Sequence, residues 1–109
     1  ATIPDGPAGE YLTDRLGEEA ARFIAGKKGE PFFLYLPHFA VHTPIQAKEA
    51  LIEKHRRKLR PGLLHNNVTY AAMIESLDAA VGRVLDALDQ HKLTQHTIVA
   101  FTSDNGGLI

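Results

Sequence analysis

One long amphipathic pattern limits the folds open to this chain more than any other feature. Between about residues 68 and 91, apolar side chains recur every three or four positions and form a continuous stripe along one helix face: Tyr70, Met73, Ile74, Leu77, Val81, Val84, Leu85 and Leu88. Asn66 or Asn67 is placed to cap the first turn with a side-chain oxygen. The pattern therefore predicts a long helix over residues 68–91.

Two shorter helical patterns precede it. The first covers about residues 13–25 and has apolar side chains on one face. Gly17 lies inside this pattern, where it costs about 1 kcal/mol relative to Ala. The second covers about residues 47–59 and stops before the Pro-Gly pair at 61–62.

Two short apolar runs, residues 32–36 and 97–102, are predicted to be strands. Neither run alternates between apolar and polar residues, which is typical of strands buried on both faces of a parallel sheet. The order of helix, strand, helices and strand favours an α/β fold with parallel central strands and flanking helices.

Composition excludes several classes of function. Twelve Lys and Arg residues stand against thirteen Asp and Glu, so no strong field favours nucleic acid or a membrane. The basic run at residues 54–60 has no interleaved aromatic side chains to stack on bases, and a solvated helix end explains it. The chain has no cysteine, which excludes disulfides, thiolate metal sites and a cysteine nucleophile.

Polar side chains directly follow both predicted strands. His38 and His42 follow the first strand, and Asp104 and Asn105 follow the second. Ligands of open parallel sheets bind outside the carboxyl ends of the strands. If the two strands are parallel, these four side chains lie at the same edge of the sheet.

Each of these groups has a functional and a purely structural interpretation. The carboxylate of Asp104 and the amide oxygen of Asn105 suit Ca²⁺ or Mg²⁺, although Ca²⁺ needs more oxygens than two residues offer. Asp, Asn and Gly are also the common residues of turns, and the local sequence alone favours a turn. His42 could donate a hydrogen bond to an anion or protonate a leaving group, or it could be a loop histidine without a role.

Three segments, in this order, resemble parts of the type I sulfatases, which are arylsulfatase-like members of the alkaline phosphatase superfamily. They are residues 31–44 (PFFLYLPHFAVHTP), 70–85 (YAAMIESLDAAVGRVL) and 97–107 (TIVAFTSDNGG). The resemblance implies an alkaline-phosphatase-like α/β fold and the hydrolysis of sulfate esters. It also implies a divalent cation, usually Ca²⁺, beside a formylglycine nucleophile that the family makes from Cys or Ser in a Cys/Ser-x-Pro-x-Arg motif.

The resemblance assigns roles to three residues. Asp104 and Asn105 match a pair of metal ligands in the family, and His42 matches the histidine that contacts the sulfate group and the leaving oxygen. His38 has no fixed counterpart. The nucleophile motif, the family's first acidic metal pair and the lysine that follows its Asp-Asn-Gly segment are all absent from these 109 residues.

We therefore expect residues 1–109 to form a single partial sulfatase domain. It would be a central segment without the nucleophile-bearing N-terminal part and without the C-terminal part, and inactive in isolation. The expected partner is a sulfate ester substrate, and the family suggests a periplasmic, secreted or lysosomal location.

Two other functions remain open from the sequence. The chain could be a segment of a phosphate or phosphonate ester hydrolase of the same superfamily. It could also be a non-catalytic binding module, in which case two lone strands would leave open sheet edges that allow self-association.

Overall fold

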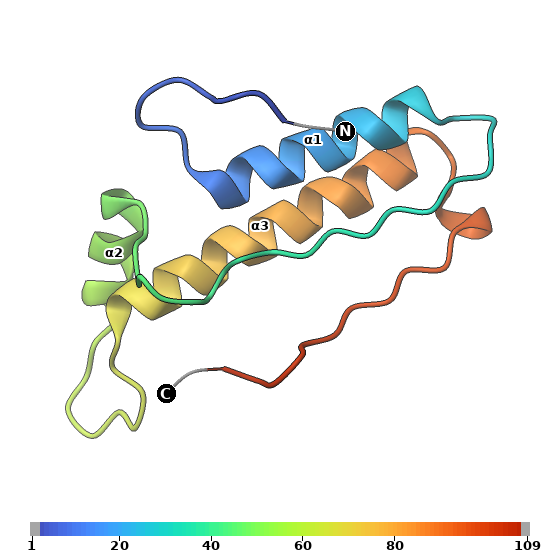
Figure 1. The fold of residues 1–109 in the computed structure, drawn as a ribbon. Coiled ribbons are helices and arrows are strands. Elements are labelled where there is room, and N and C mark those ends of the chain that lie inside the picture. Colours follow the sequence, from blue (N-terminus) through green and yellow to red (C-terminus); the bar gives the residue numbers. More distant parts are fainter. Residues whose placement is uncertain (1–2, 108–109) are drawn as a thin grey trace.

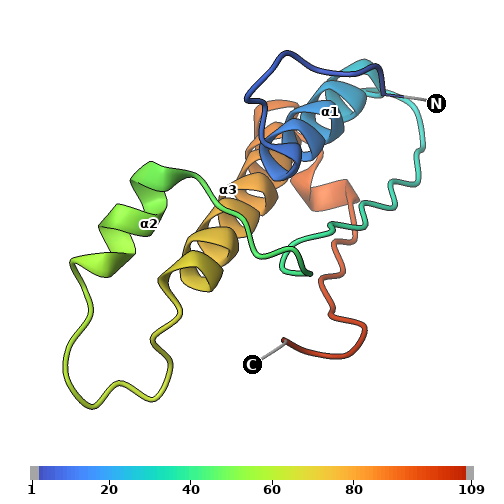
Figure 2. The ribbon, with the colours of Figure 1, turned by 60° about the vertical axis from the view of Figure 1, so that its left-hand side comes forward.

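Three α-helices and one short 3-10 helix make up the regular structure of residues 3–107, the part of the chain that the computed structural model describes. They are α1 (Leu12–Gly26), α2 (Glu49–Arg56), α3 (Val68–Gln90) and η1 (Thr94–His96). α1 lies along α3, and α2 packs near the N-terminal end of α3 (Figures 1 and 2). The three predicted helices are confirmed, and α2 is shorter than predicted at both ends.

Hydrogen bonds from outside the helix define both ends of α3. Its N-cap is Asn67, whose side-chain oxygen accepts the backbone N–H of Tyr70 at 3.0 Å. At the other end, Lys92 has a left-handed φ of 58°, and the N–H of Leu93 reaches back to the carbonyl of Leu88 at 2.8 Å. This is the bonding pattern of a Schellman motif, with Lys92 in the place that usually holds glycine.

Small residues allow α1 and α3 to approach closely. A Cβ on Gly17 would lie only 3.0 Å from both the Cα and the Cβ of Ala80, so the glycine that weakens the helix pattern is needed for packing. Farther along the same contact, Ile24 is fully buried with Ala87 and Leu88. The core of the described chain therefore lies between these two helices.

α2 is attached to α3 by charged side chains. Glu75 of α3 accepts hydrogen bonds from Lys54 Nζ at 2.6 Å and from His55 Nε2 at 2.8 Å. The basic run at residues 54–60, which the sequence alone explains as a solvated helix end, therefore contributes two partners to an acid of α3.

The two segments predicted to be parallel strands are not strands. Within residues 3–107 no segment forms a strand, and the described structure is all-helical. Figure 1 shows residues 32–36 and 97–102 as extended chain that runs past α3 toward its N-terminal half. The prediction of an α/β fold with a parallel central sheet is therefore wrong for the described chain.

The burial pattern explains this outcome. Along the first extended segment, half-buried Phe32 and Leu34 alternate with Phe33 and Tyr35, which are 87% and 76% exposed. Phe32 and Leu34 pack against the core cluster of the helices. A sheet needs neighbouring backbones about 4.8 Å apart, and here the extended segment packs on helices with one face and is open on the other.

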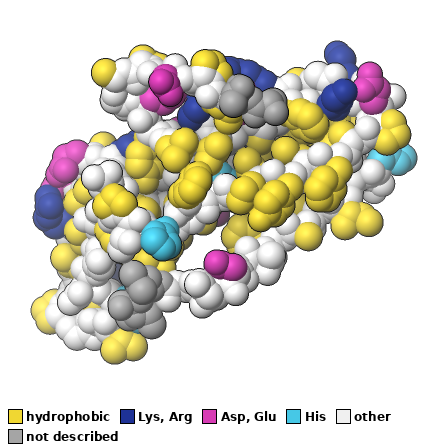
Figure 3. Space-filling model, in the orientation of Figure 1, with side chains coloured by type: hydrophobic (Ala, Val, Ile, Leu, Met, Phe, Trp, Pro, Cys, Tyr) yellow, Lys and Arg dark blue, Asp and Glu magenta, His cyan; other side chains and the backbone are white. Residues whose placement is uncertain are grey.

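Apolar side chains remain on the surface as a result. Ile98 is 98% exposed and Phe101 is 74% exposed, and Figure 3 shows hydrophobic side chains spread over much of one face. The predicted self-association through sheet edges has no sheet to act through in the described residues. No helix within residues 3–107 has the length and apolar character required to cross a membrane.

Candidate metal and sulfate site

His42 lies in a tight turn that follows the first extended segment. Its backbone N–H donates to the carbonyl of Phe39 at 2.8 Å, which closes the turn. Its Nδ1 lies 2.8 Å from the carbonyl oxygen of Thr43. In the tautomer with the proton on Nδ1, that nitrogen donates to this oxygen, and Nε2 is the nitrogen that can meet a ligand. The side chain is exposed.

The chain that follows His42 is held to the start of α1. Tyr11 Oη donates to the carbonyl of Gln46 at 3.0 Å. Lys48 Nζ pairs with the carboxylate of Asp14 at 2.8 Å and lies 5.6 Å from the centre of the Tyr11 ring. These contacts link the His42 turn to the helical body.

Asp104 and Asn105 lie in residues 103–107, which we call the Asp-Asn loop. Two local hydrogen bonds shape it: Asn105 N–H donates to Asp104 Oδ1 at 2.9 Å, and Gly106 N–H donates to Ser103 Oγ at 3.0 Å. Gly106 has a left-handed φ of 80°, which glycine adopts readily. These are the features of a turn, and every residue of the loop is exposed.

The side-chain amide of Asn105 turns one end toward two oxygens. That end lies 3.1 Å from Asp104 Oδ1 and 3.1 Å from the carbonyl oxygen of Gly106. With the amide nitrogen at this end, it donates to both oxygens, and the Asn105 side chain is tied into the turn.

The loop offers few of the ligands that a hard cation needs. Ca²⁺ takes roughly 6–8 oxygen ligands, and the oxygen-bearing side chains of Asp104 and Asn105 cannot provide them all. Among residues 3–107, no group of three or more His, Cys, Asp and Glu side chains is arranged to hold a metal ion. The described residues therefore do not form a complete cation site by themselves.

The Asp-Asn loop ends beside the first turn of α3. A Cβ on Gly107 would overlap the hydroxyl of Tyr70 and lie 3.6 Å from its Cζ, so the phenol and the Gly107 backbone are in close contact. No sequence pattern singled out Tyr70 for this place, because it also belongs to the apolar stripe. Within residues 3–107, no hydrogen bond or ion pair joins His42 to the Asp-Asn loop, so their shared pocket stays a prediction.

His38 lies four residues before His42 and is enclosed differently. Both of its ring nitrogens are buried, and neither has a hydrogen-bond partner in the described part of the chain. Burial lowers the pKa of His38 from its usual 6.5, because the charged imidazolium would lose its water. The ring is therefore held neutral.

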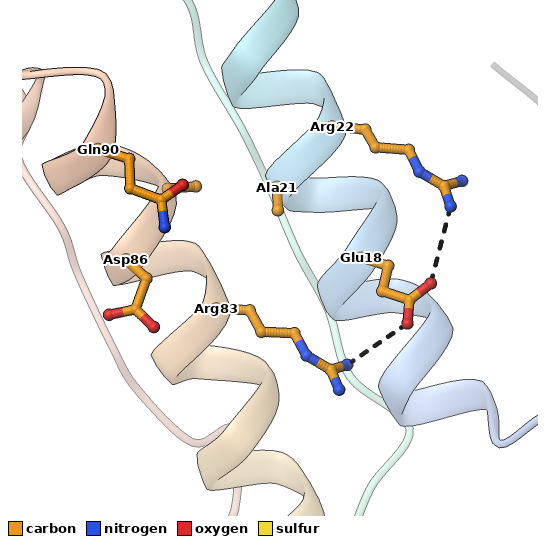
Figure 4. Close-up of a pocket in the computed structure, with 7 residues that line it drawn as sticks. Glu18, Ala21, Arg22, Arg83, Asp86 and Gln90 are labelled. Carbon is orange, nitrogen blue, oxygen red and sulfur yellow. Dashed lines mark ion pairs between the residues drawn. The ribbon is translucent and has the colours of Figure 1, made fainter.

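A shallow groove between α1 and α3 lies apart from these loops. It has a volume of about 370 Å³, and Figure 4 shows Glu18 between two arginines on its rim. The carboxylate of Glu18 lies 3.7 Å from Arg22 and 4.0 Å from Arg83. The groove contains none of the predicted site residues, and its two arginines are both paired with Glu18.

Comparison with known proteins identifies the family. The family model described as Sulfatase matches residues 2–109. A sulfatase of Formosa agariphila is 37% identical over 110 residues, which cover 92% of this chain and 20% of that protein. Human arylsulfatase H is 40% identical over 98 residues, covering 90% of this chain and 16% of that protein. The N-acetylgalactosamine-6-O-sulfatase of Bacteroides thetaiotaomicron is 36% identical over 100 residues, which cover 92% of this chain and 18% of that protein.

A solved structure agrees with these sequence matches. The crystal structure of Ps i-CgsB in complex with k-i-k-neocarrahexaose superposes with a TM-score of 0.65 at 36% identity, covering 77% of this chain and 18% of that one. The chain spans about one fifth or less of the length of each of these relatives. With the family model matched along nearly its whole length, the chain belongs to the sulfatase family.

Proposed function

We propose that this chain carries part of the active site of a sulfuric ester hydrolase. In this proposal Asp104 and Asn105 bind a divalent cation, Ca²⁺ by preference, and His42 contacts the sulfate group and the leaving oxygen. The observation that carries the proposal is that Asp104 and Asn105 are adjacent in one exposed, hydrogen-bonded turn, where a carboxylate and an amide are both within reach of solvent. Membership of the sulfatase family supports it.

The loop's own chemistry suits a hard cation. The carboxylate of Asp104 supplies negative charge, and the Asn105 amide can present its oxygen without a competing proton. A divalent cation held there would stabilise the negative charge that a sulfate ester gathers on its oxygens during attack. Exposure of the whole loop leaves room for the further ligands that the cation requires.

The hydrogen bond of His42 suits it to contact an oxygen anion through Nε2. With a proton on Nδ1 donated to the Thr43 carbonyl, neutral His42 presents Nε2 as an acceptor and protonated His42 presents it as a donor. The protonated form can donate to a sulfate oxygen or give its proton to the departing alcohol oxygen. The Thr43 carbonyl keeps the ring in one orientation for either task.

The nucleophile has to come from outside these 109 residues, because they contain no Cys/Ser-x-Pro-x-Arg motif. We propose that residues 1–109 are the central part of a sulfatase domain and catalyse no hydrolysis alone. The relatives' names include an arylsulfatase and a sugar sulfatase, so the shared substrate class is the sulfate ester. An assay of the chain with an aryl sulfate should show no turnover above buffer.

Titration of the chain with Ca²⁺, followed by backbone amide NMR shifts, tests the cation site. We expect shifts concentrated in residues 103–107, lost in Asp104→Ala and weakened in Asn105→Ala. Asp78→Ala is the matched control, since Asp78 is an exposed acid on α3 outside the loop. Shifts that persist in Asp104→Ala, or that spread evenly over surface acids, would refute the assignment.

A further inference from the structure

We propose that Tyr70 is a positioning residue for the Asp-Asn loop, holding the turn that carries Asp104 and Asn105 in place against the first turn of α3. This inference rests on the proposed function of the loop as a cation site. It assigns to Tyr70 no contact with the cation or the substrate. Its basis is the contact between the Tyr70 phenol and the backbone of Gly107, three residues after Asp104.

A side chain at residue 107 would require the Tyr70 phenol to shift. A Cβ built on Gly107 would overlap the Tyr70 hydroxyl and lie 3.6 Å from Cζ. A Cβ built on the neighbouring Gly106 would have no atom within 4 Å. The close approach is therefore specific to residue 107, where the loop passes over the phenol.

Tyr70 belongs to a helix, whose backbone is more constrained than that of the loop it contacts. It lies in the first turn of α3, and its backbone N–H is bonded to the Asn67 cap at 3.0 Å. Its side chain has two rotatable χ angles and is half-buried. The phenol therefore offers the loop a fixed surface whose place is set by the long helix.

The loop needs such a support because its own hydrogen bonds are local. The bonds to Asp104 Oδ1 and Ser103 Oγ shape the turn, and both join residues within the loop. They fix the loop's shape and leave its direction relative to α3 undetermined. Groups that orient metal ligands from behind typically change metal affinity about 10–100-fold when they are removed.

The first test measures the order of the loop without metal. Heteronuclear NOE values of the Ser103–Gly107 amides in the full chain should fall in Tyr70→Ala and stay near wild type in Tyr70→Phe, which keeps the ring. Tyr35→Phe is the matched control, because Tyr35 is 76% exposed on the first extended segment. The helical circular dichroism of each variant checks that the helices form. Unchanged loop order in Tyr70→Ala overturns the proposal.

The second test measures Ca²⁺ affinity and uses the steric contact directly. Tyr70→Ala should weaken Ca²⁺ binding by about tenfold, at the lower end of the range for groups that orient metal ligands. Gly107→Ala should weaken it too, because the added methyl group meets the Tyr70 hydroxyl. In the Tyr70→Phe background that hydroxyl is gone, so the loss of Ca²⁺ affinity caused by Gly107→Ala should be several-fold smaller. If Gly107→Ala weakened Ca²⁺ binding only by disrupting the fold, removing the Tyr70 hydroxyl would not restore the affinity.

The outcomes separate this inference from the proposed function. If Asp104→Ala abolishes Ca²⁺ binding while Gly107→Ala costs the same in both backgrounds, the cation site stands and the Tyr70 role is refuted. If no variant binds Ca²⁺, the proposed function fails on this chain, and the NOE values alone decide whether Tyr70 holds the loop.

Discussion

Gly17 of α1 lies so close to Ala80 of α3 that a Cβ on the glycine would come within 3.0 Å of both the Cα and the Cβ of Ala80. Both residues are buried, and Ala80 is fully enclosed. Helix atoms on the Ala80 side cannot move aside as a flexible side chain could, so the contact resists any added atom.

We expect Gly82→Ala to stabilise the chain and Gly17→Ala to leave its stability unchanged or lower. Both substitutions replace a glycine inside a helix by alanine, which by itself raises the free energy of unfolding by up to about 1 kcal/mol. A Cβ on Gly82 meets nothing within 4 Å, so Gly82→Ala should keep this gain. At Gly17 overpacking costs about 1–3 kcal/mol, which offsets or exceeds it. Urea unfolding followed by circular dichroism measures both, and an equal gain at the two sites would contradict the packing argument.

The Asn67 cap should carry a measurable share of the stability of α3. Asn67→Ala removes the oxygen that accepts the Tyr70 N–H and should lower the free energy of unfolding by about 1 kcal/mol. Asn66→Ala is the neighbouring control, because no cap bond of α3 involves Asn66. Equal effects of the two substitutions in urea unfolding would argue against the cap.

Glu75 should hold α2 against α3, and the effect should depend on pH. The hydrogen bond from Lys54, and after it the one from His55, lowers the pKa of Glu75 below its usual 4.5. The stabilisation is therefore present above pH 4.5 and is lost as pH falls through the depressed pKa. Glu75→Gln should lower the protection factors of the α2 amides at neutral pH toward those of the wild type in acid, measured by hydrogen exchange and corrected for the intrinsic rate at each pH.

Glu53 provides the control for this prediction. Its pKa is also lowered, first by Arg56 and then by Arg57, but both arginines belong to α2 or its C-cap. Glu53→Gln therefore removes an ion pair that does not cross to α3. If it speeds exchange in α2 as much as Glu75→Gln does, the interhelical contact is not what holds α2.

His38 should make the fold less stable as the pH falls below 6.5. The pKa of folded His38 is lowered by burial, so the unfolded chain takes up a proton between pH 6.5 and that lower value while the folded chain does not. His38→Phe should remove this dependence. It should also raise the free energy of unfolding by about 1 kcal/mol, since two unpartnered nitrogens leave the interior.

Urea unfolding at several pH values tests the role of His38. His65→Phe is the control, because His65 is exposed in the loop before α3. A wild-type pH profile that His38→Phe leaves unchanged, or that His65→Phe flattens equally, would show that His38 is not the group responsible.

The sequence predicted what local bonding decides. The stripe from Tyr70 to Leu88 located α3, since a helix closes its hydrogen bonds within four residues of each position. The motifs also selected the residues of the candidate site, because the chemistry of Asp104, Asn105 and His42 is visible without coordinates. The family resemblance stated from those motifs is confirmed by the family model.

Distant contacts decided the rest. Phe32 and Ile98 lie in runs that predict strands, yet a strand exists only where a second backbone bonds to it, and in the described chain these runs pack on helices or remain exposed. In the sequence, Gly17 only weakens the helix pattern; in the structure it makes room for Ala80. Tyr70 is one apolar residue of the stripe in the sequence, and the structure places Gly107 against it. Spacing along a chain determines which groups share a helix face, whereas contacts between remote residues depend on how the whole chain fills space.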